Sequence, residues 1–424
     1  MAQIPLFQPP IEWIMPDSYP DLSNYDEIAI DLETKDPNLT VLGSGWPRND
    51  GHIIGVAVAV KNDQWYFPVR HEIGPNFDPK RTFDWLRDVV SKDRSYVFHN
   101  APYDVGWLLT ENVTVKGKYI DTMVIAPLLD ENRFSYALNA VGRDYLQERK
   151  SEVELREAAK SFGVDAKSEM YKLPAHYVGK YAEQDAALTL KLWEHFKSLI
   201  IKEDIKDIVD LELKVLKTII PMRQKGVRVD LEKAEVIKKD FLQREKKLLD
   251  AITKQTGVAV EIWAAESVSK AFDAIHLTYP KTEKTNAPSF TKGFLVNHAH
   301  EIPRMIVQAR EYNKARTTFI DTILKHQVKG RMIRGLFLPE EGCLWGAFDY
   351  SSQEPRLVVH YAKLMGFKKA EEFAKQYAVD PRTDFHQMAA DIVGVPRKQA
   401  KDINLGLFYG MGTKKLAAQL GLDH

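Results

Sequence analysis

The sequence predicts a chain of two parts: an α/β domain with a mixed sheet and flanking helices over residues 1–205, and a mostly helical domain over residues 206–424. Three observations predict this arrangement. Short apolar segments rich in β-branched residues alternate with helical periodicities in the first part. Long charged segments with helical spacing dominate the second part. Residues 1–204 carry 23 Lys and Arg against 32 Asp and Glu, whereas the remainder carries 36 against 27.

The bulk composition is that of a globular protein, with 44% hydrophobic and 28% charged residues in a chain long enough for more than one core. The longest apolar run, residues 53–60, is too short to span a bilayer. The first residues lack a basic segment followed by an apolar one. The single cysteine, Cys343, cannot form an intramolecular disulfide. We therefore expect a cytoplasmic protein without membrane contact, and the basic second half indicates a polyanionic partner.

Four strands are expected in the first domain, because apolar and β-branched residues cluster there between turn-forming residues. They cover residues 27–33, 53–60, 65–69 and 96–99. Helical spacing covers residues 83–90, and Pro102 suits the first turn of a helix after the fourth strand. The clearest helix covers residues 181–200, where Leu188, Leu192 and Phe196 recur every four residues.

The second domain is expected to begin between residues 200 and 210 with a charged helical stretch, which breaks at Pro221 and again at residues 226–230. Further helices are expected over residues 230–256, 301–325 and 397–410, with a polar loop over residues 280–290. A strand-like apolar segment leads to Asp349. Neither internal repeats nor low-complexity tracts occur in the sequence.

Three acidic motifs stand in the first domain: Asp31-Leu32-Glu33, Asn100-xxx-Asp104 and Tyr181-xxx-Asp185. Residues two apart on a strand, or four apart on a helix, share one face. Taken singly, the motifs also fit an acidic turn, a helix N-cap and a surface pair. Together, four carboxylates and one phenol could bind two hard divalent cations. Such a two-metal site hydrolyses phosphodiesters.

These three motifs, in this order, resemble those of the DEDDy 3′–5′ exonucleases over residues 20–200. The resemblance implies a ribonuclease-H-like fold and removal of nucleotides from the 3′ end of single-stranded DNA. It also implies that Asp31, Glu33, Asp104 and Asp185 bind two Mg²⁺ or Mn²⁺ ions and that Tyr181 positions the attacking water. Asp121-Thr122 fits the strand that precedes the helical part of this family.

A second constellation lies near the C-terminal end. Residues 349–356 read DYSSQEPR, and Arg397, Lys401, Leu405 and Tyr409 repeat every four residues. This spacing forms one stripe along a helix, on which two cations can bind a triphosphate. An amphipathic surface helix has the same spacing. The acidic motif that precedes the stripe favours a nucleotide-binding site over such a surface helix.

The two segments resemble motifs A and B of family A DNA polymerases. The residues around motif A are most similar to those of bacteriophage members of this family. The resemblance implies that Asp349 and the carbonyl of Tyr350 bind a catalytic metal and that Glu354 excludes the ribose 2′-hydroxyl. Arg397 and Lys401 would contact the triphosphate of a deoxynucleoside triphosphate. Leu405 and Tyr409 would line the nucleotide pocket. The implied nucleic-acid partner is a DNA primer–template.

The chain departs from this family at three places. Leu405 stands where an aromatic residue is usual, which affects sugar discrimination. Only eight residues, 326–333, separate Lys325 from Arg334, where the family has many tens of residues. The sequence ends at His424 before the family's His-Asp-Glu motif, which supplies the second catalytic aspartate. We therefore expect this chain to hydrolyse 3′ ends but to add nucleotides only if the missing palm is supplied.

Three interpretations follow. The leading one is the N-terminal portion of a phage-type family A DNA polymerase with a proofreading exonuclease, located in the infected bacterial host. The second is one subunit of a split polymerase, whose partner polypeptide carries the rest of the polymerase domain. The third is a stand-alone exonuclease or DNA-binding protein with a relic polymerase region.

Overall fold

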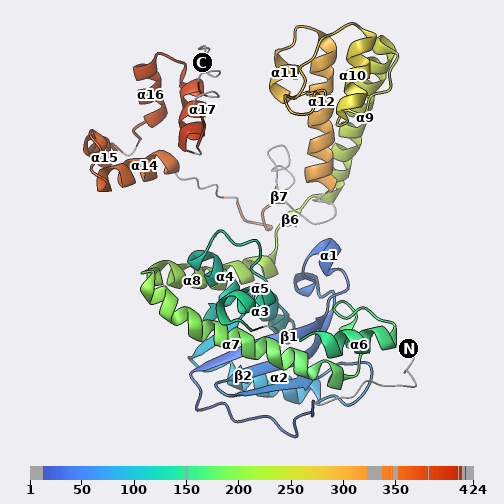
Figure 1. Cartoon of the computed structure of the whole chain (residues 1–424), viewed down its shortest axis with the longest axis vertical. Coiled ribbons are helices and arrows are strands. Elements are labelled where there is room, and N and C mark those ends of the chain that lie inside the picture. The colour runs from blue at the N-terminus through green and yellow to red at the C-terminus, as the bar shows by residue number, and fades with distance from the viewer. Residues whose placement is uncertain are drawn as a thin grey trace. The chain divides into compact units, whose positions relative to one another are not determined.

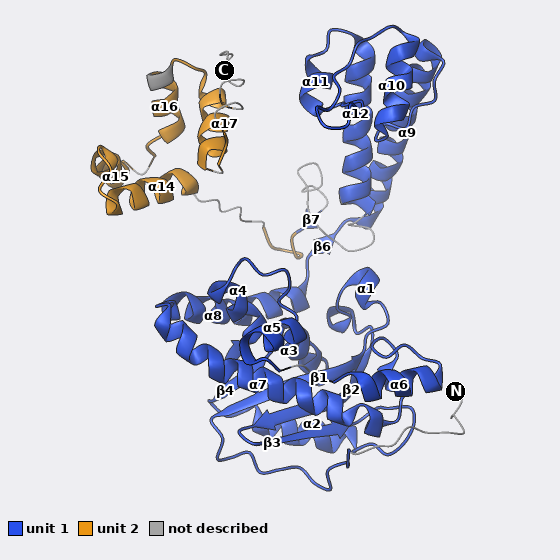
Figure 2. Ribbon diagram, in the orientation of Figure 1, with its two compact units in different colours: residues 1–338 blue, residues 339–424 orange. Residues whose placement is uncertain are grey.

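The computed structural model describes residues 13–148, 151–321, 337–344, 346, 352–380, 382–408, 410–412 and 416. The chain divides into two compact units, Met1–Leu338 and Pro339–His424 (Figure 2). Asp349, Tyr350 and Tyr409 lie outside the described residues, so their predicted roles stay predictions. Within the described part, no helix combines the length and apolar character needed to cross a membrane.

A five-stranded mixed sheet forms the centre of the first domain. Its strands are β1 (Glu27–Lys35), β2 (His52–Val60), β3 (Asp63–Pro68), β4 (Ser95–Phe98) and β5 (Lys118–Asp121). They lie in the order β3-β2-β1-β4-β5, with β1 antiparallel to β2, β2 antiparallel to β3, and β4 parallel to both β1 and β5. This confirms the predicted mixed sheet, whose topology is that of a ribonuclease-H-like domain.

Helices and short turns flank this sheet (Figure 1). They are α1 (Leu39–Leu42), η1 (Trp46–Arg48), α2 (Pro79–Val89), α3 (Ala101–Thr110), α4 (Thr122–Leu129), α5 (Leu138–Leu146), α6 (Val153–Phe162), η2 (Met170–Lys172), η3 (Ala175–Tyr177) and α7 (Gly179–Lys202). Strand β2 is buried from Ile53 to Val60, which explains its uninterrupted apolar run. The helices expected after residues 83, 102 and 181 are present.

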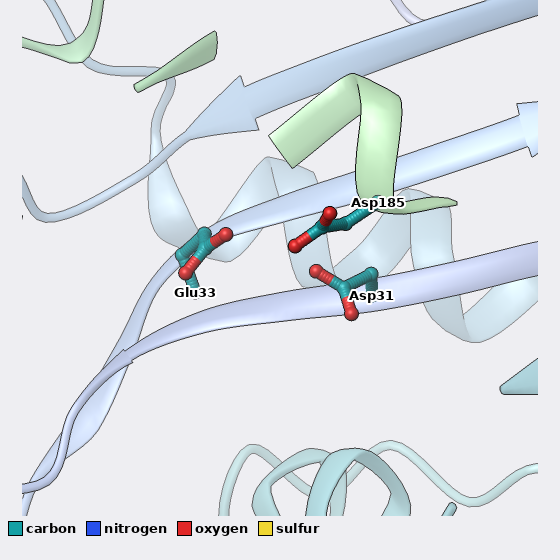
Figure 3. Close-up of side chains that lie close together, drawn as sticks. All are labelled: Asp31, Glu33 and Asp185. Atoms are coloured by element: carbon teal, nitrogen blue, oxygen red, sulfur yellow. The ribbon is translucent and has the colours of Figure 1, made fainter. Parts of the chain in front are cut away.

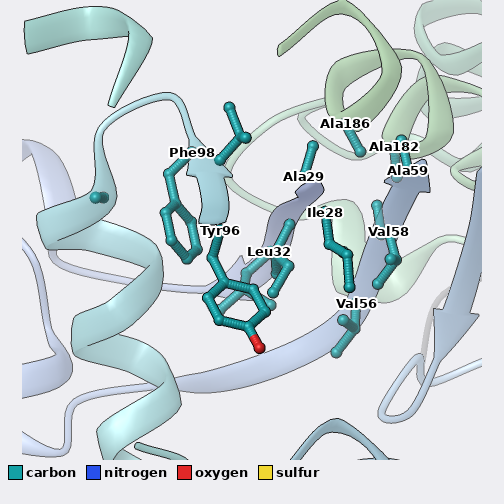
Figure 4. Packing of buried hydrophobic residues seen from close by; sticks show 14 of the residues in the cluster. Ile28, Ala29, Leu32, Val56, Val58, Ala59, Tyr96, Phe98, Ala182 and Ala186 are labelled. Carbon is teal, nitrogen blue, oxygen red and sulfur yellow. The ribbon is translucent and has the colours of Figure 1, made fainter. Parts of the chain in front are cut away.

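Small residues let helix α7 lie close to the sheet. Ala29 of β1 and Ala59 of β2 are cross-strand partners, and both are buried. Ala182 and Ala186 of α7 are buried in the same cluster, as Figure 4 shows. Because Ala29, Asp31 and Glu33 follow one another at every second residue of β1, they share one face, and this close packing brings α7 to the face that carries the acidic residues.

Helix α8 (Lys206–Lys225) differs from the prediction, since it continues through Pro221. Proline removes one backbone hydrogen bond in a helix interior. Here the ring is exposed in the last turns, while Leu213, Leu216 and Ile220 are buried in the core of the first domain. This burial outweighs the local cost. The helix ends at Gly226, whose φ is +66°. The domain boundary at residues 205–206 stays a prediction, but α8 packs with the first core.

The remainder of the first unit is mostly helical, with one short pair of strands. It contains β6 (Arg228–Val229), α9 (Leu231–Thr256), α10 (Ala265–Ala274), α11 (Lys292–Asn297), α12 (Glu301–Lys314), the π-helical turn η4 (Ala315–Ile320) and β7 (Phe337–Leu338). Its own core gathers around Ile252, Phe272 and Ile306. The helix predicted over residues 301–325 therefore changes to π-helical geometry at Ala315. Residues 280–290 form the expected polar loop, closed by a bridge between Lys281 and Pro288.

The second unit contains α14 (Gln353–Leu364), α15 (Ala370–Val379), α16 (Phe385–Val393) and α17 (Arg397–Phe408). Helix α17 corresponds to the helix predicted over residues 397–410. Its buried residues are Ala400 and Ile403, so the stripe of Arg397, Lys401 and Leu405 lies on another side of the helix.

A half-buried carboxylate, that of Glu183, ties α7 to β3 and to the N-terminal segment. The indole N–H of Trp13 and the backbone N–H of Tyr66 donate to Glu183 Oε1 at 2.8 and 3.0 Å. Trp13 lies directly on Gly179, where an added Cβ would come within 2.1 Å of the indole ring. Burial raises the pKa of Glu183 to about 7.

We expect Glu183→Gln to raise Tm at pH 8 by about 2–4 °C, the shift that about 1 kcal/mol produces in a domain of this size. The folded-state pKa of Glu183 is raised, so its ionisation destabilises the fold as pH rises from the unfolded-state value through about 7. Glutamine keeps an acceptor oxygen for Trp13 and Tyr66 without the charge. Thermal unfolding followed by circular dichroism at pH 5 and pH 8 measures the effect.

At pH 5 the gain should be clearly smaller. Burial also lowers the pKa of His71, to about 4, but this group is common to both proteins and cancels in the comparison. A Tm that falls equally at both pH values would contradict the assignment of a raised pKa to Glu183.

Candidate functional site

Strand β1 supplies the first two acidic residues. Asp31 and Glu33 alternate with buried Leu32 and so project from the same face of the sheet. Their cross-strand partners are small, Ala57 for Asp31 and Gly55 for Glu33. The register of the β1–β2 pair shifts between Glu33 and Thr34, because Ile54 of β2 is passed over in the ladder, as at a β-bulge. Bulges of this kind occur often beside active sites, because they redirect side chains at the end of a strand.

Helix α7 brings the third carboxylate to this face. One carboxylate oxygen from each of Asp31, Glu33 and Asp185 lies within 4.8 Å of the other two (Figure 3). Asp185 is buried, whereas Asp31 and Glu33 are half-buried. The structure therefore brings together three of the four carboxylates that the sequence singled out.

Asp104 lies in the first turn of α3 and is 3% exposed. Its Oδ1 accepts a hydrogen bond of 3.0 Å from the backbone N–H of Leu32, between the two acidic residues of β1. Burial raises the pKa of Asp104 well above its usual range, and the neighbouring charge of Asp31 raises it further. Asp104 thus adjoins the three-carboxylate cluster and is bound to its strand.

Tyr181 lies one helical turn before Asp185 on α7 and is hydrogen-bonded to it. Burial raises the pKa of Tyr181, as do the charges of Glu33, Asp185 and Asp31. The side chain is therefore a neutral phenol at neutral pH. A phenol can orient a water molecule through hydrogen bonds, which is the role predicted for it.

Two further residues, which the sequence did not single out, lie beside the cluster, since Tyr66 stands in the cross-strand row of Asp31 and Ala57 and contacts His71. Tyr66 of β3 is fully buried, and an added Cβ at Gly55 would lie 2.0 Å from its hydroxyl oxygen. His71 Nδ1 lies 2.8 Å from the carbonyl oxygen of Leu173, an acceptor, so Nδ1 carries the proton. The hydroxyl of Tyr66 then donates to His71 Nε2 at 2.7 Å. The absence of a side chain at Gly55 is the one sequence signal for this arrangement.

The donor set of the cluster fits hard divalent cations. Carboxylate oxygens are the protein ligands that Mg²⁺ and Mn²⁺ prefer. The spacing of Asp31, Glu33 and Asp185 lets them contact one ion together. Burial raises the pKa of Asp104, and the charge of Asp31 adds to this effect through a repulsion that a cation would relieve. The residues present therefore fit a metal centre.

In the second unit, the structure places Glu354 in the first turn of α14 and Arg397, Lys401 and Leu405 along α17. Arg397 Nε forms an ion pair of 2.6 Å with Asp384 Oδ2. Burial lowers the pKa of His386, and its charged neighbours include Asp384, Lys401, Arg397 and Glu354. The structure thus gathers Glu354, Arg397 and Lys401 around His386, a residue that sequence reasoning missed.

Two family models match the chain. The model of a 3′–5′ exonuclease matches residues 15–201, and the model of DNA polymerase family A matches residues 325–424. The first match covers all four carboxylates and Tyr181, and the second covers the residues around His386.

Relatives match along nearly the whole chain. A DNA-directed DNA polymerase of Pseudomonas phage M6 is 33% identical over 98% of this chain and 73% of its own length. That alignment spans 485 positions, more than this chain has, so the relative contains residues that this chain lacks within the matched region. DNA polymerase DpoZ of Salmonella phage PMBT28 is 27% identical over 96% of this chain and 73% of its own length.

A solved structure supports the fold. The polymerase domain of Pol1 from M. smegmatis, in complex with DNA primer–template and dNTP, aligns with a TM-score of 0.71 at 17% identity, covering 95% of this chain and 71% of that chain. The fold, the two family models and the phage relatives agree with the resemblance found in the motifs. The chain belongs to the phage-type family A DNA polymerases with an N-terminal 3′–5′ exonuclease domain.

Proposed function

We propose that the first domain removes nucleotides from the 3′ end of single-stranded DNA by two-metal hydrolysis. The observation that carries this proposal is the convergence of Asp31, Glu33 and Asp185 beside buried Asp104. In this proposal the four carboxylates hold two Mg²⁺ or Mn²⁺ ions. When bound, such ions lower the pKa of water and stabilise the charge on the leaving oxygen.

The protein's own residues position the metal ligands and the attacking water. Asp31 and Glu33 are fixed by strand β1, and Asp185 by helix α7, so the ligands sit on regular elements rather than on loops. The hydroxyl of Tyr181 orients the attacking water as a hydrogen-bond partner, because its raised pKa keeps it protonated. Asp104 is buried, so its electrostatic interactions with the other carboxylates are less screened by water.

We propose further that residues 349–409 bind a deoxynucleoside triphosphate for addition to a DNA primer. Arg397 and Lys401 would contact the phosphates, and Glu354 and Leu405 would face the sugar. Asp349, Tyr350 and Tyr409 would complete this site. Support comes from the gathering of Glu354, Arg397 and Lys401 around His386 and from the family match. Arg397 is half exposed and paired with Asp384, so a phosphate would compete with that carboxylate for the guanidinium.

Asp31→Asn should abolish hydrolysis of a 5′-labelled single-stranded oligonucleotide in Mg²⁺. Removal of a direct ligand should cost more than the ~10–100-fold typical of losing a second-shell partner. The metal-free variant should unfold at a Tm no lower than the parent, because Asp31 repels Asp104. Gel-resolved product ladders and thermal unfolding measure the two effects.

Asp63→Asn is the matched control, since it removes an exposed carboxylate at the start of β3 of the same sheet. It should leave the rate unchanged, and EDTA should stop hydrolysis by both the parent and the control. Hydrolysis that persists in Asp31→Asn, or that is as fast on blunt duplex DNA as on single strands, would overturn the proposal.

Tyr181→Phe tests the role of the phenol. We expect kcat to fall by up to about 100-fold, the cost of one mispositioned reacting group. Binding of Mn²⁺ should stay within the error of the parent, because the hydroxyl orients water and is not one of the four carboxylate ligands. Single-turnover kinetics and Mn²⁺ titration monitored by electron paramagnetic resonance separate the two. An equal loss of metal affinity would assign Tyr181 to metal binding instead.

A further inference from the structure

Asp121, at the end of β5, is a buried carboxylate that the reaction described above does not use. Its side chain is completely inaccessible to solvent. Burial raises the pKa of Asp121, while four backbone N–H donors act in the opposite direction. A buried carboxylate is costly unless such donors satisfy it, so their arrangement shows what the residue holds together.

The four donors come from two helices. Asp121 Oδ1 accepts from the N–H groups of Met123 and Val124, at 2.9 and 3.4 Å, in the first turn of α4. The same oxygen accepts from Asn100 at 3.0 Å, and Oδ2 accepts from Ala101 at 2.7 Å. Asp121 is therefore the N-cap of α4 and, across the sheet edge, a cap for α3 as well.

Helix α3 depends on this outside cap. Its own N-cap residue, Asn100, has a left-handed backbone with φ of +83° and makes no side-chain capping bond. Pro102 has no N–H to offer. The Asp121 carboxylate thus accepts the first N–H groups at the start of α3 and fixes that start against the end of β5.

Asp104 stands three residues after Ala101, in the same first helical turn. Its own carboxylate is bound to the Leu32 N–H on β1. Asp104 is therefore held at two points: its side chain on β1, and its helix start on β5 through Asp121. A shift of the helix start would move Asp104 relative to Asp31.

We propose that Asp121 is a positioning residue of the exonuclease reaction, which caps α3 so that Asp104 meets the carboxylates of β1 at a distance suited to metal binding. This inference rests on the proposed function of the site. Asp121 touches neither the DNA nor the ions in this proposal. It acts through the backbone of Asn100 and Ala101.

Asp121→Ser separates the two caps. Serine is a good N-cap for its own helix, so α4 keeps a cap, but its side chain is too short to reach α3. We expect Mn²⁺ binding to the full chain to weaken by about 10-fold, within the range known for loss of second-shell partners. Electron paramagnetic resonance with Mn²⁺ alone measures this without turnover, and the Mg²⁺ concentration for half-maximal hydrolysis should rise in parallel.

Asp121→Asn distinguishes position from charge. It loses the same negative charge as the serine variant but still reaches α3 with its carbonyl oxygen. It should therefore lose clearly less Mn²⁺ affinity than Asp121→Ser. Equal losses in the two variants would overturn the proposal in favour of a charge effect. If the serine variant fails to fold, Asp121→Thr replaces it, because threonine also caps its own helix and is too short to reach α3, and unchanged Mn²⁺ affinity in that variant would overturn the proposal as well.

Asp78→Ser is the matched control. Asp78 caps α2 by accepting the N–H of Arg81 at 2.8 Å, and that helix carries none of the four carboxylates. The same substitution there should leave Mn²⁺ binding unchanged, and an equal loss would show that any weakened cap has this effect. If the parent itself neither binds Mn²⁺ nor hydrolyses DNA, the proposed function fails. If the parent does both and Asp121→Ser behaves like it, this inference alone fails.

Discussion

Repulsion between carboxylates is the constraint on which the first domain depends. Asp31, Glu33 and Asp185 place oxygens within 4.8 Å of one another, and the pKa of buried Asp104 is raised by burial and by Asp31. Such a cluster opposes folding unless donors and positive charge are brought to it. The Leu32 N–H supplies one donor, to Asp104. Divalent cations would supply the charge, so metal binding and stability of this domain are linked.

The packing that imposes this repulsion comes from small residues. Ala29, Ala59, Ala182 and Ala186 allow α7 to approach the sheet (Figure 4). Gly55, the cross-strand partner of Glu33, leaves space for the ring of Tyr66. A larger side chain at any of these positions would lift α7 or displace Tyr66, because a packed core does not absorb added volume cheaply. The distances between the carboxylates are therefore set by residues that carry no functional group of their own.

Local patterns were enough to predict β1 to β4, helix α7 and the face shared by Asp31 and Glu33, since these depend on alternation and helical spacing, whereas the short strand β5 was not among the predicted strands. The order of the three motifs added Asp104 and Asp185. The break predicted at Pro221 was wrong, because burial of Leu213, Leu216 and Ile220 outweighs one lost hydrogen bond. The Tyr66–His71 pair and the double cap by Asp121 join segments distant in the sequence. No periodicity marks contacts of that kind, so only the tertiary structure reveals them.

Crowded negative charge also decides what Tyr181 can do. A phenol becomes a base only as phenolate, and both burial and the three nearby carboxylates raise its pKa. Tyr181 is therefore a neutral phenol at neutral pH and does not take a proton from water. Its hydroxyl is left with hydrogen bonding, to Asp185 and to the water that it orients. Burial and the three carboxylates thus favour a phenol that orients the water and leave removal of the water's proton to the chemistry that metal ions supply when bound.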